Sequence, residues 1–390
     1  MSRERLDALV VGGGIVGAAL ALGLRQRGLA VALVEVKAPA PWQAARPDLR
    51  VYAIAPDSEA LLARLGVWEA VRGARAQAYT GMQVWDAGGG RPLRFDTGAL
   101  GVPRLGHIVE HGLLVDRLWA ALAAAGVPCA TGAALEAIEE GESGVVAVLA
   151  DGRRLAAARL FGADGLHSRV RALRGIGTRE HDYRARGLVA YLRPGKPHRD
   201  TCWQRFLPTG PLALLPCAEG RISIVWSLPD AEAERLLTLE PERFEAELGR
   251  ASDRVLGPLA LDSERAAFPL RRLLAERMLD GRVALLGDAA HGVHPLAGQG
   301  VNLGLRDVAG LLDGIDAAKA KRREALSDTV LQRWAQQRVS ENTVAAHAFE
   351  AIHRVYGNDA PLPTALRGWV LAAANLPPVN RLLWRRAAGL

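Results

Sequence analysis

Apolar and polar positions at the start of the chain follow a pattern that predicts a strand, a helix and a second strand. Residues 6–11 are a short apolar run rich in Val and Leu, which is typical of a buried strand. Residues 18–27 then place apolar side chains at helical spacing until Gly28, a residue type that often ends a helix. Residues 30–35 form a second apolar run. The pattern therefore predicts a β-α-β unit, which is the building block of a parallel sheet.

Further along the chain, helical and strand-like patterns take turns. Residues 47–68 predict a loop that enters a helix, and residues 107–125 predict one long amphipathic segment. Residues 82–95 alternate around a Gly-rich turn, which indicates a hairpin, and strand-like runs return between residues 181 and 268. Beyond Asp316 the chain becomes helical. This order predicts an α/β fold in which a second, sheet-based domain is inserted into the first.

Three glycines follow the first strand at a spacing that suits a bound dinucleotide. Gly12, Gly14 and Gly17 permit a tight turn, a close approach of the backbone to a pyrophosphate, and close packing of the helix on the strand. The N–H groups at the helix N-terminus would then face the phosphates. Glu35 ends the second strand, where its carboxylate would accept hydrogen bonds from ribose hydroxyls. NAD and FAD both use this unit, so the choice between them stays open here.

Two later motifs bear on that choice. Residues 161–171 read FGADGLHSRVR, in which Asp164 lies in a turn between a strand and a helix. Residues 281–307 begin with a strand that ends at Gly287 and Asp288, and they continue into a second Gly-rich loop that opens another helix. A carboxylate at the end of such a strand can bind a ribityl hydroxyl. The N–H groups of the second loop can face an electron-rich ring.

Together the three motifs resemble those of a known enzyme family, the class A flavoprotein monooxygenases of the para-hydroxybenzoate hydroxylase fold. The motifs follow the family's order as GGGIVG at residues 12–17, ADGLHSRVR at 163–171 and GDAAHGVHPLAGQGVNLGLRD at 287–307. Within the family, the chain is most similar to the ubiquinone-biosynthesis hydroxylases that act on polyprenylphenols, through segments such as QRFLPTGPLALLP. The similarity covers nearly the whole chain. Ala55 and His111 depart from that branch, which bears on substrate contacts more than on the cofactor.

The resemblance implies FAD as the cofactor and a division of the chain into three parts. We expect a discontinuous, Rossmann-like FAD-binding domain, an inserted β-sheet substrate domain and a C-terminal helical segment. The expected ranges are 1–75, 104–180 and 269–320 for the FAD-binding domain, 76–103 and 181–268 for the substrate domain, and 321–390 for the helical segment.

The same resemblance implies a role for each motif. The first three glycines would hold the FAD pyrophosphate, Arg50 would reach the FAD phosphates or ribityl chain, and Asp164 would support both FAD and the visiting nicotinamide nucleotide. Backbone N–H groups of residues 295–300 would face the flavin pyrimidine edge. The expected FAD contacts are Gly12, Gly14, Gly17, Glu35, Arg50, Asp164, Gly287, Asp288, Gly298, Gly300 and Asn302, and the residues expected beside the reacting ring are Pro295, Gly298, Gln299 and Gly300.

The reaction that the resemblance implies is hydroxylation of an aromatic ring. NAD(P)H reduces FAD, O₂ adds to give a C4a-hydroperoxyflavin, and the distal oxygen attacks a prenylated phenol of ubiquinone biosynthesis. Two alternatives stay open. One is a hydroxylase or epoxidase of a soluble aromatic, because a fold alone does not choose a substrate. The other is a flavin-retaining, non-catalytic subunit of a lipid-modifying complex. No Ser-His-Asp set or pair of carboxylates identifies a base.

Composition and charge argue against several other classes. The formal net charge is +7, but the basic residues are spread along the chain among acids, so we expect no nucleic-acid partner. The 3 cysteines lie far apart without a CxxC pair, which favours free thiols. His291 and His294 lie about one helical turn apart, but no third ligand accompanies them, so we expect no metal site.

Some polar residues have two interpretations. Glu110, with His107 and His111, is either a capping and core group or a contact to flavin or substrate. Arg205 is either an ordinary strand residue or part of the ring pocket, which we expect residues 206–211 to line.

The two ends of the chain bear on its location. The N-terminus leads directly into the first strand, without the features of a signal peptide, and no run reaches the roughly 18 apolar residues of a membrane span. We therefore expect a cytoplasmic protein. Residues 367–386 combine Trp and Leu with Arg. This composition suits a peripheral contact with the inner face of the membrane or with a ubiquinone-biosynthesis complex. The alternative is a helix pair packed on the FAD-binding domain.

Overall fold

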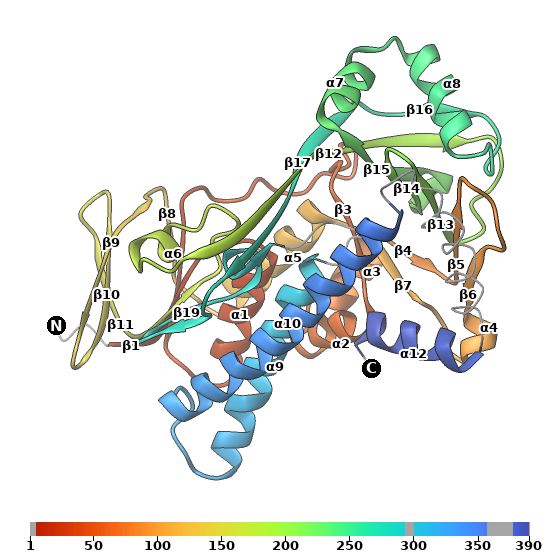
Figure 1. Cartoon of the computed structure of the whole chain (residues 1–390). Helices are drawn as coiled ribbons and strands as arrows, with labels where there is room; N and C mark the ends of the chain where they lie inside the picture. Colours follow the sequence, from red (N-terminus) through yellow and green to blue (C-terminus); the bar gives the residue numbers. More distant parts are fainter. Residues whose placement is uncertain (1–4, 293–299, 357–376, 390) are drawn as a thin grey trace.

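The computed structural model of the chain describes residues 5–292, 300–356 and 377–389. Within these ranges the chain forms three β-sheets with helices packed against them, which confirms the predicted α/β fold class. Figure 1 shows the two larger sheets at opposite ends of the molecule, with the N-terminus beside the first of them and long helices of the C-terminal part running between the two ends.

The first sheet contains the predicted β-α-β unit. Its main strands, in spatial order, are β18 (Leu279–Asp280), β19 (Val283–Leu285), β11 (Arg154–Gly162), β1 (Leu6–Val11), β2 (Val31–Glu35) and β8 (Cys129–Thr131). All neighbours from β19 to β8 are parallel. Two antiparallel strands complete the sheet: β10 (Gly144–Leu149) pairs with β11, and β9 (Leu135–Gly141) pairs with β10. Because parallel strands end at one edge, the loops after β1, β2, β11 and β19 meet there.

Three helices pack together beside this sheet. α1 (Ile15–Gln26) is almost wholly buried and packs against α5 (His111–Ala124) and α9 (Gly300–Ala320). The contact between α1 and α9 is close because Gly23 has no side chain: a Cβ there would lie 2.5 Å from Cδ1 of Leu312. This packing fixes the position of the helix N-termini relative to the edge of the sheet.

A small third sheet joins segments that the sequence pattern does not separate. Its order is β3 (Val51–Ile54), β7 (Gly106–Glu110) and β4 (Ala76–Tyr79), with both outer strands antiparallel to β7. The predicted loop within residues 47–68 is therefore wrong at β3, and the predicted single segment of residues 107–125 is a strand followed by a helix. These strands are too short to show a period of their own, and pairing with distant neighbours decides their structure.

The second large sheet contains nine strands. In spatial order its path is β20 (His291–Gly292), β17 (Ala266–Ala275), β12 (Thr178–Pro194), β15 (Ile222–Pro229), β14 (Gly210–Pro216), β13 (Thr201–Leu207), β5 (Gly81–Asp86) and β6 (Leu93–Asp96), and β16 (Leu259–Leu261) pairs with β12. β5 and β6 confirm the predicted hairpin. Two helices absent from the prediction lie between β15 and β16, namely α7 (Asp230–Thr238) and α8 (Pro241–Ala251).

The remaining helices lie at the edges of the sheets and in the C-terminal part. They are α2 (Pro56–Arg64), α3 (Trp68–Arg75), α4 (Thr97–Leu100), α6 (Arg169–Leu173), α10 (Asp328–Tyr356) and α12 (Pro377–Ala388), with short 3₁₀ turns η1 (Ala218–Gly220) and η2 (Gly287–Ala289). Among the described residues, no helix combines the length and the apolar character needed to cross a bilayer.

Candidate active site

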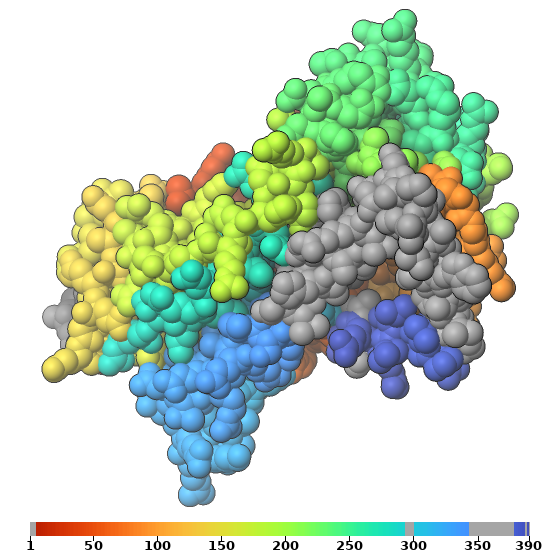
Figure 2. Space-filling view, viewed as in Figure 1, coloured from red at the N-terminus to blue at the C-terminus, as the bar shows by residue number. Residues whose placement is uncertain are grey.

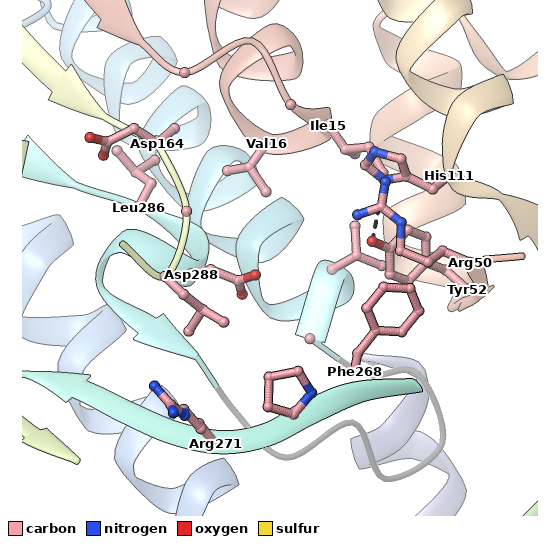
Figure 3. A pocket seen from close by; sticks show the side chains of 18 of the residues that line it. Ile15, Val16, Arg50, Tyr52, His111, Asp164, Phe268, Arg271, Leu286 and Asp288 are labelled. Atoms are coloured by element: carbon pink, nitrogen blue, oxygen red, sulfur yellow. Dashed lines mark hydrogen bonds between the residues drawn. The ribbon is translucent and has the colours of Figure 1, made fainter. Parts of the chain in front are cut away.

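A cavity of about 1020 Å³ lies where the first sheet, the small sheet and the nine-stranded sheet meet. Figure 3 shows its central part: Asp164 and Leu286 lie on one side, Arg50, Tyr52 and His111 on the other, and Asp288 between them. The walls thus come from segments more than 200 residues apart in the chain, and their carboxylates, arginine and apolar groups face one space.

The glycines of the first motif form a tight turn beside the cavity. Gly12 has a φ of +105°, and a Cβ there would lie 2.3 Å from the backbone oxygen of Ala163. A Cβ on Gly17 would lie 1.9 Å from the oxygen of Gly12, so this glycine permits the close approach of helix to turn. Gly14 precedes α1 without a side-chain cap, and a Cβ there would meet nothing within 4 Å. The uncapped start of a buried helix therefore faces open cavity, where its N–H groups can bind phosphates.

Glu35 stands beside this turn at the end of β2. Its Oε2 accepts a hydrogen bond of 2.6 Å from the N–H of Gly13, and its Oε1 accepts one of 3.2 Å from the N–H of Lys37. Both the turn and the carboxylate line the cavity. The carboxylate is thus held in place with lone pairs left for hydroxyl donors.

Asp164 is fixed by the helical turn that follows it. Its Oδ1 accepts a hydrogen bond of 2.5 Å from Oγ of Ser168, and its Oδ2 accepts one of 3.0 Å from the N–H of Val170. Arg171 donates to the backbone oxygens of Ala289, at 2.9 Å, and Leu166, at 2.7 Å. The second motif is therefore tied directly to the third.

Asp288 presents its carboxylate to the cavity from the turn after β19. The side chain is accessible from the cavity although protein surrounds it, and this burial raises the pKa of the carboxyl, against the lowering effect of His291. Gly287, just before it, has a φ of +56°, a left-handed conformation that favours glycine. Its N–H donates to Oδ2 of Asp307 at 3.0 Å, which fixes the turn to α9.

A pair of neutral side chains lines the opposite wall. The Oη of Tyr52 lies 3.3 Å from Nδ1 of His111 (Figure 3). Burial, reinforced by the charge of Arg50, lowers the pKa of His111 to about 4, and burial raises the pKa of Tyr52 to about 12. Both groups are therefore uncharged near neutral pH. Asp48 holds this wall by accepting hydrogen bonds from the N–H groups of Arg50, at 2.9 Å, and Gly112, at 3.1 Å.

The structure separates the three polar residues that the sequence grouped. His111 lines the cavity, whereas Glu110 and His107 do not. Glu110 is 3% exposed and accepts hydrogen bonds from Nε1 of Trp42 and the N–H of Asp48, each at 3.0 Å, and from Arg75. His107 packs edge-on against Trp68 and lies beside Glu59.

His291 belongs to a buried charge cluster and not to a helix. His291 lies in strand β20, so the prediction that it is separated from His294 by one helical turn is wrong for His291. Its Nε2 lies 2.5 Å from Oδ2 of Asp307, whose other oxygen accepts a hydrogen bond of 2.8 Å from Nε of Arg338. Within the described residues, no group of three or more His, Cys, Asp or Glu side chains could hold a metal ion.

The third motif is described only at its two ends. Gly300 lines the cavity and begins α9. Asn302 is fully buried, and its side chain bonds the backbone of Ala53, at 2.8 Å, and Ala55, at 2.9 Å. It therefore ties the start of α9 to β3 from outside the cavity. The predicted residues Pro295, Gly298 and Gln299, together with His294, lie outside the described residues.

The nine-stranded sheet forms a floor that the sequence identified only in part. Pro211 lines the cavity as expected, but Phe206 packs with Val84 and Leu93. Arg205 points to the other face, where it donates to the backbone oxygens of Arg250 and Ala251, both at 3.1 Å. The lining residues that the sequence reasoning missed include Tyr52, Gln204, Ser227 and Phe268. The period of two along β13 was the available signal for Gln204.

This arrangement fits FAD. A glycine turn leaves the start of a buried helix facing the cavity, a fixed carboxylate ends the next strand, and a second carboxylate lies further along the same edge. These are donors and acceptors for a pyrophosphate, a ribose and a ribityl chain, in that order. The apolar sheet beyond them leaves space for a ring and a further organic molecule.

Comparisons with known proteins agree with this assignment. The family described as FAD binding domain matches residues 5–341. The chain is 35% identical to 3-demethoxyubiquinol 3-hydroxylase of Escherichia coli, over 100% of both chains. It is also 35% identical to ubiquinone hydroxylase UbiL of Rhodospirillum rubrum, over 98% of this chain and 89% of that one. The crystal structure of p-nitrophenol 4-monooxygenase PnpA from Pseudomonas putida has the same fold, with a TM-score of 0.80, 20% identity and 98% coverage of both chains.

Proposed function

The chain belongs to this family of FAD-dependent monooxygenases, and we propose that it hydroxylates the ring of a prenylated phenol in ubiquinone biosynthesis, with NAD(P)H and O₂ as co-substrates. The observation that carries the proposal is a cavity that joins the edge of the first sheet, with its glycine turn and carboxylates, to the largely apolar face of the nine-stranded sheet. The full-length relatives whose names include ubiquinone or ubiquinol hydroxylase support this choice of pathway.

The residues of the first sheet would bind and orient FAD. The N–H groups at the start of α1 would hold the pyrophosphate, Glu35 the adenosine ribose, and Asp288 the ribityl chain. Arg50 lies where a guanidinium can reach a phosphate or the ribityl hydroxyls. When bound, FAD would supply the redox and oxygen-transfer chemistry that the reaction with NAD(P)H and O₂ requires.

The remaining walls would hold the substrate and keep water out. Val189, Leu215 and Val225 form part of the sheet floor, and burial of an apolar substrate against them excludes water from the reacting ring. His111 holds no proton on one ring nitrogen near neutral pH, because its pKa is lowered to about 4. Tyr52 keeps its phenolic proton. This pair therefore supplies one donor and one acceptor without placing a charge in the cavity.

A steady-state assay separates the proposed enzyme from a non-catalytic flavin subunit. The FAD-loaded protein should oxidise NAD(P)H faster when a synthetic prenylphenol is added, and mass spectrometry should find the hydroxylated phenol in step with the NAD(P)H consumed. A soluble phenol without the prenyl chain serves as the matched control and should give slower turnover at equal concentration. Flavin retention without any substrate-stimulated oxidation would refute the proposal.

A further inference from the structure

The floor of the cavity carries two polar side chains that have no role in the proposed binding of FAD. Gln204 and Ser227 line the cavity from β13 and β15 of the nine-stranded sheet. Each is more than nine-tenths buried, at 8% and 7% exposed. Among the hydrogen bonds of the described residues, neither side chain has a partner.

The strand register places the two residues on one face of the sheet. Gln204 pairs across the ladder with Ala213, which pairs in turn with Val225. Ser227 follows Val225 by two positions, so it points to the same face. All four residues line the cavity. An amide and a hydroxyl thus stand at two points of a floor whose intervening positions are apolar.

Because both side chains line the cavity and no described residue bonds them, their amide and hydroxyl are available to a ligand that brings hydrogen-bonding atoms to these two points. The ligand should be uncharged there. Arg271 on β17 is the charged side chain that this sheet contributes to the described lining of the cavity, and it is half exposed and lies 3.6 Å from Asp182. A carboxylated ring would find no buried cation on the floor.

Building on the proposed hydroxylase function, we infer that Gln204 and Ser227 hydrogen-bond the oxygen substituents of an uncharged aromatic ring and thereby select which ring carbon faces the flavin. The amide can donate to or accept from a ring hydroxyl or carbonyl, and the serine hydroxyl can do either as well. Two separated contacts on one flat wall fix the rotation of a planar ring, which a purely apolar wall leaves free. The side chains act on orientation and specificity and take no part in redox chemistry.

A binding experiment with two matched probes tests this assignment without turnover. The probes are 2-octylphenol and octylbenzene, which differ by one hydroxyl, and binding to the FAD-loaded protein is followed by the change in flavin fluorescence. We expect the wild type to bind the phenol about tenfold more tightly, the ratio for one net hydrogen bond. Gln204→Leu or Ser227→Ala should bring the ratio of the two affinities closer to one. The double variant should bind the two probes equally. In the double variant, hydroxylation of a prenylphenol should give a mixture of ring positions.

Control variants distinguish the loss of these hydrogen bonds from misfolding and from loss of activity. Gln83→Leu makes the same chemical change on the same sheet outside the cavity lining and should keep the wild-type ratio. Ser227→Thr retains the hydroxyl and should keep it too. If Gln204→Leu loses FAD, Gln204→Met preserves the length of the side chain without its hydrogen bonds and gives the same measurement. A ratio unchanged in the Gln204 and Ser227 variants, or near one in the wild type, overturns the assignment. Absence of hydroxylation with an intact ratio instead contradicts only the proposed function.

Discussion

At the scale of single residues, three carboxylates line one wall of the cavity, and an uncharged pair beside Arg50 lines the other. Glu35, Asp164 and Asp288 stand along the edge of the first sheet, where bound FAD would offer hydroxyl donors. Tyr52 and His111 face them as an uncharged pair. The glycine spacing and the strand-end acids made the first set predictable. The second set depends on pairing between β3 and β7, which brings residues 52 and 111 together and which no local pattern reveals.

Replacing Glu35 should weaken FAD binding because its carboxylate would accept charge-assisted hydrogen bonds from the adenosine ribose. Glu35→Ala should lower the affinity about tenfold or more, since such a bond contributes roughly 1.5–3 kcal/mol. Glu35→Gln keeps an acceptor for Gly13 and should lose less. Titration of the apoprotein with FAD, followed by flavin fluorescence, measures both variants. Equal affinity in Glu35→Ala and wild type would exclude Glu35 from the FAD site.

His111 should make the apoprotein sensitive to acid. Folding lowers its pKa from 6.5 to about 4, so the unfolded chain binds more protons between these values, and stability is lost as the pH falls through that range. Between pH 7 and pH 5 we expect this residue to remove about 2 kcal/mol from the free energy of unfolding. His111→Asn should show a correspondingly smaller loss in urea unfolding at the two pH values. The same pH dependence in both proteins would contradict the assigned burial of a neutral imidazole.

At the scale of elements, strands and helices with a strong apolar period were predictable from the sequence, and short strands that pair with distant neighbours were not. β1, β2 and the β5-β6 hairpin appear where the apolar pattern predicts them. β3 and β7 were not predicted because their strand structure depends on hydrogen bonds to strands distant in the sequence. α7 and α8 lie inside a block predicted as strands, where their amphipathic faces pack on the second sheet. The sequence thus predicted the lining of the cavity along the first sheet better than its floor.

The cluster under the third motif should hold α10 to α9. Arg338 is 4% exposed and Asp307 is fully buried, so removal of the guanidinium leaves a buried carboxylate with fewer partners. We expect Arg338→Leu to lower the free energy of unfolding by about 3–5 kcal/mol. Arg333→Leu, on the exposed side of the same helix, should change it by less than about 0.5 kcal/mol. Denaturant unfolding measures the free energy of unfolding of both variants. Equal values for Arg338→Leu and Arg333→Leu would refute a structural role for the cluster.

At the scale of the whole molecule, the two large sheets share one cavity, and the discontinuous domain division stays a prediction. The C-terminal segment is the other feature at this scale. Of residues 367–386, the structure describes 377–386. In α12, Trp384 packs against Leu105, whereas Leu382 and Leu383 are 57% and 42% exposed. Figure 2 shows α12 at the surface of the molecule, in dark blue.

This exposed face should give weak, salt-reversible binding to anionic vesicles. Arg381, Arg385 and Arg386 are exposed on the same helix, and each basic residue near an anionic surface contributes roughly 1 kcal/mol. Changing all three to Ala should reduce co-sedimentation with phosphatidylglycerol vesicles at low salt. The same loss of charge at exposed Lys321, Arg323 and Arg333 should leave binding nearly unchanged. Equal binding by both triple variants, each with normal flavin content, would contradict a specific role for α12.

The central claim is that this chain uses FAD to place one oxygen atom of O₂ on an aromatic ring. The most direct measurement is mass spectrometry of the product formed from a prenylphenol by the FAD-loaded protein with NAD(P)H under ¹⁸O₂. The account predicts a product carrying one ¹⁸O atom, and an unlabelled product when the label is in water instead. A product labelled from water, or NAD(P)H oxidation that yields only hydrogen peroxide with every phenol tested, would contradict it.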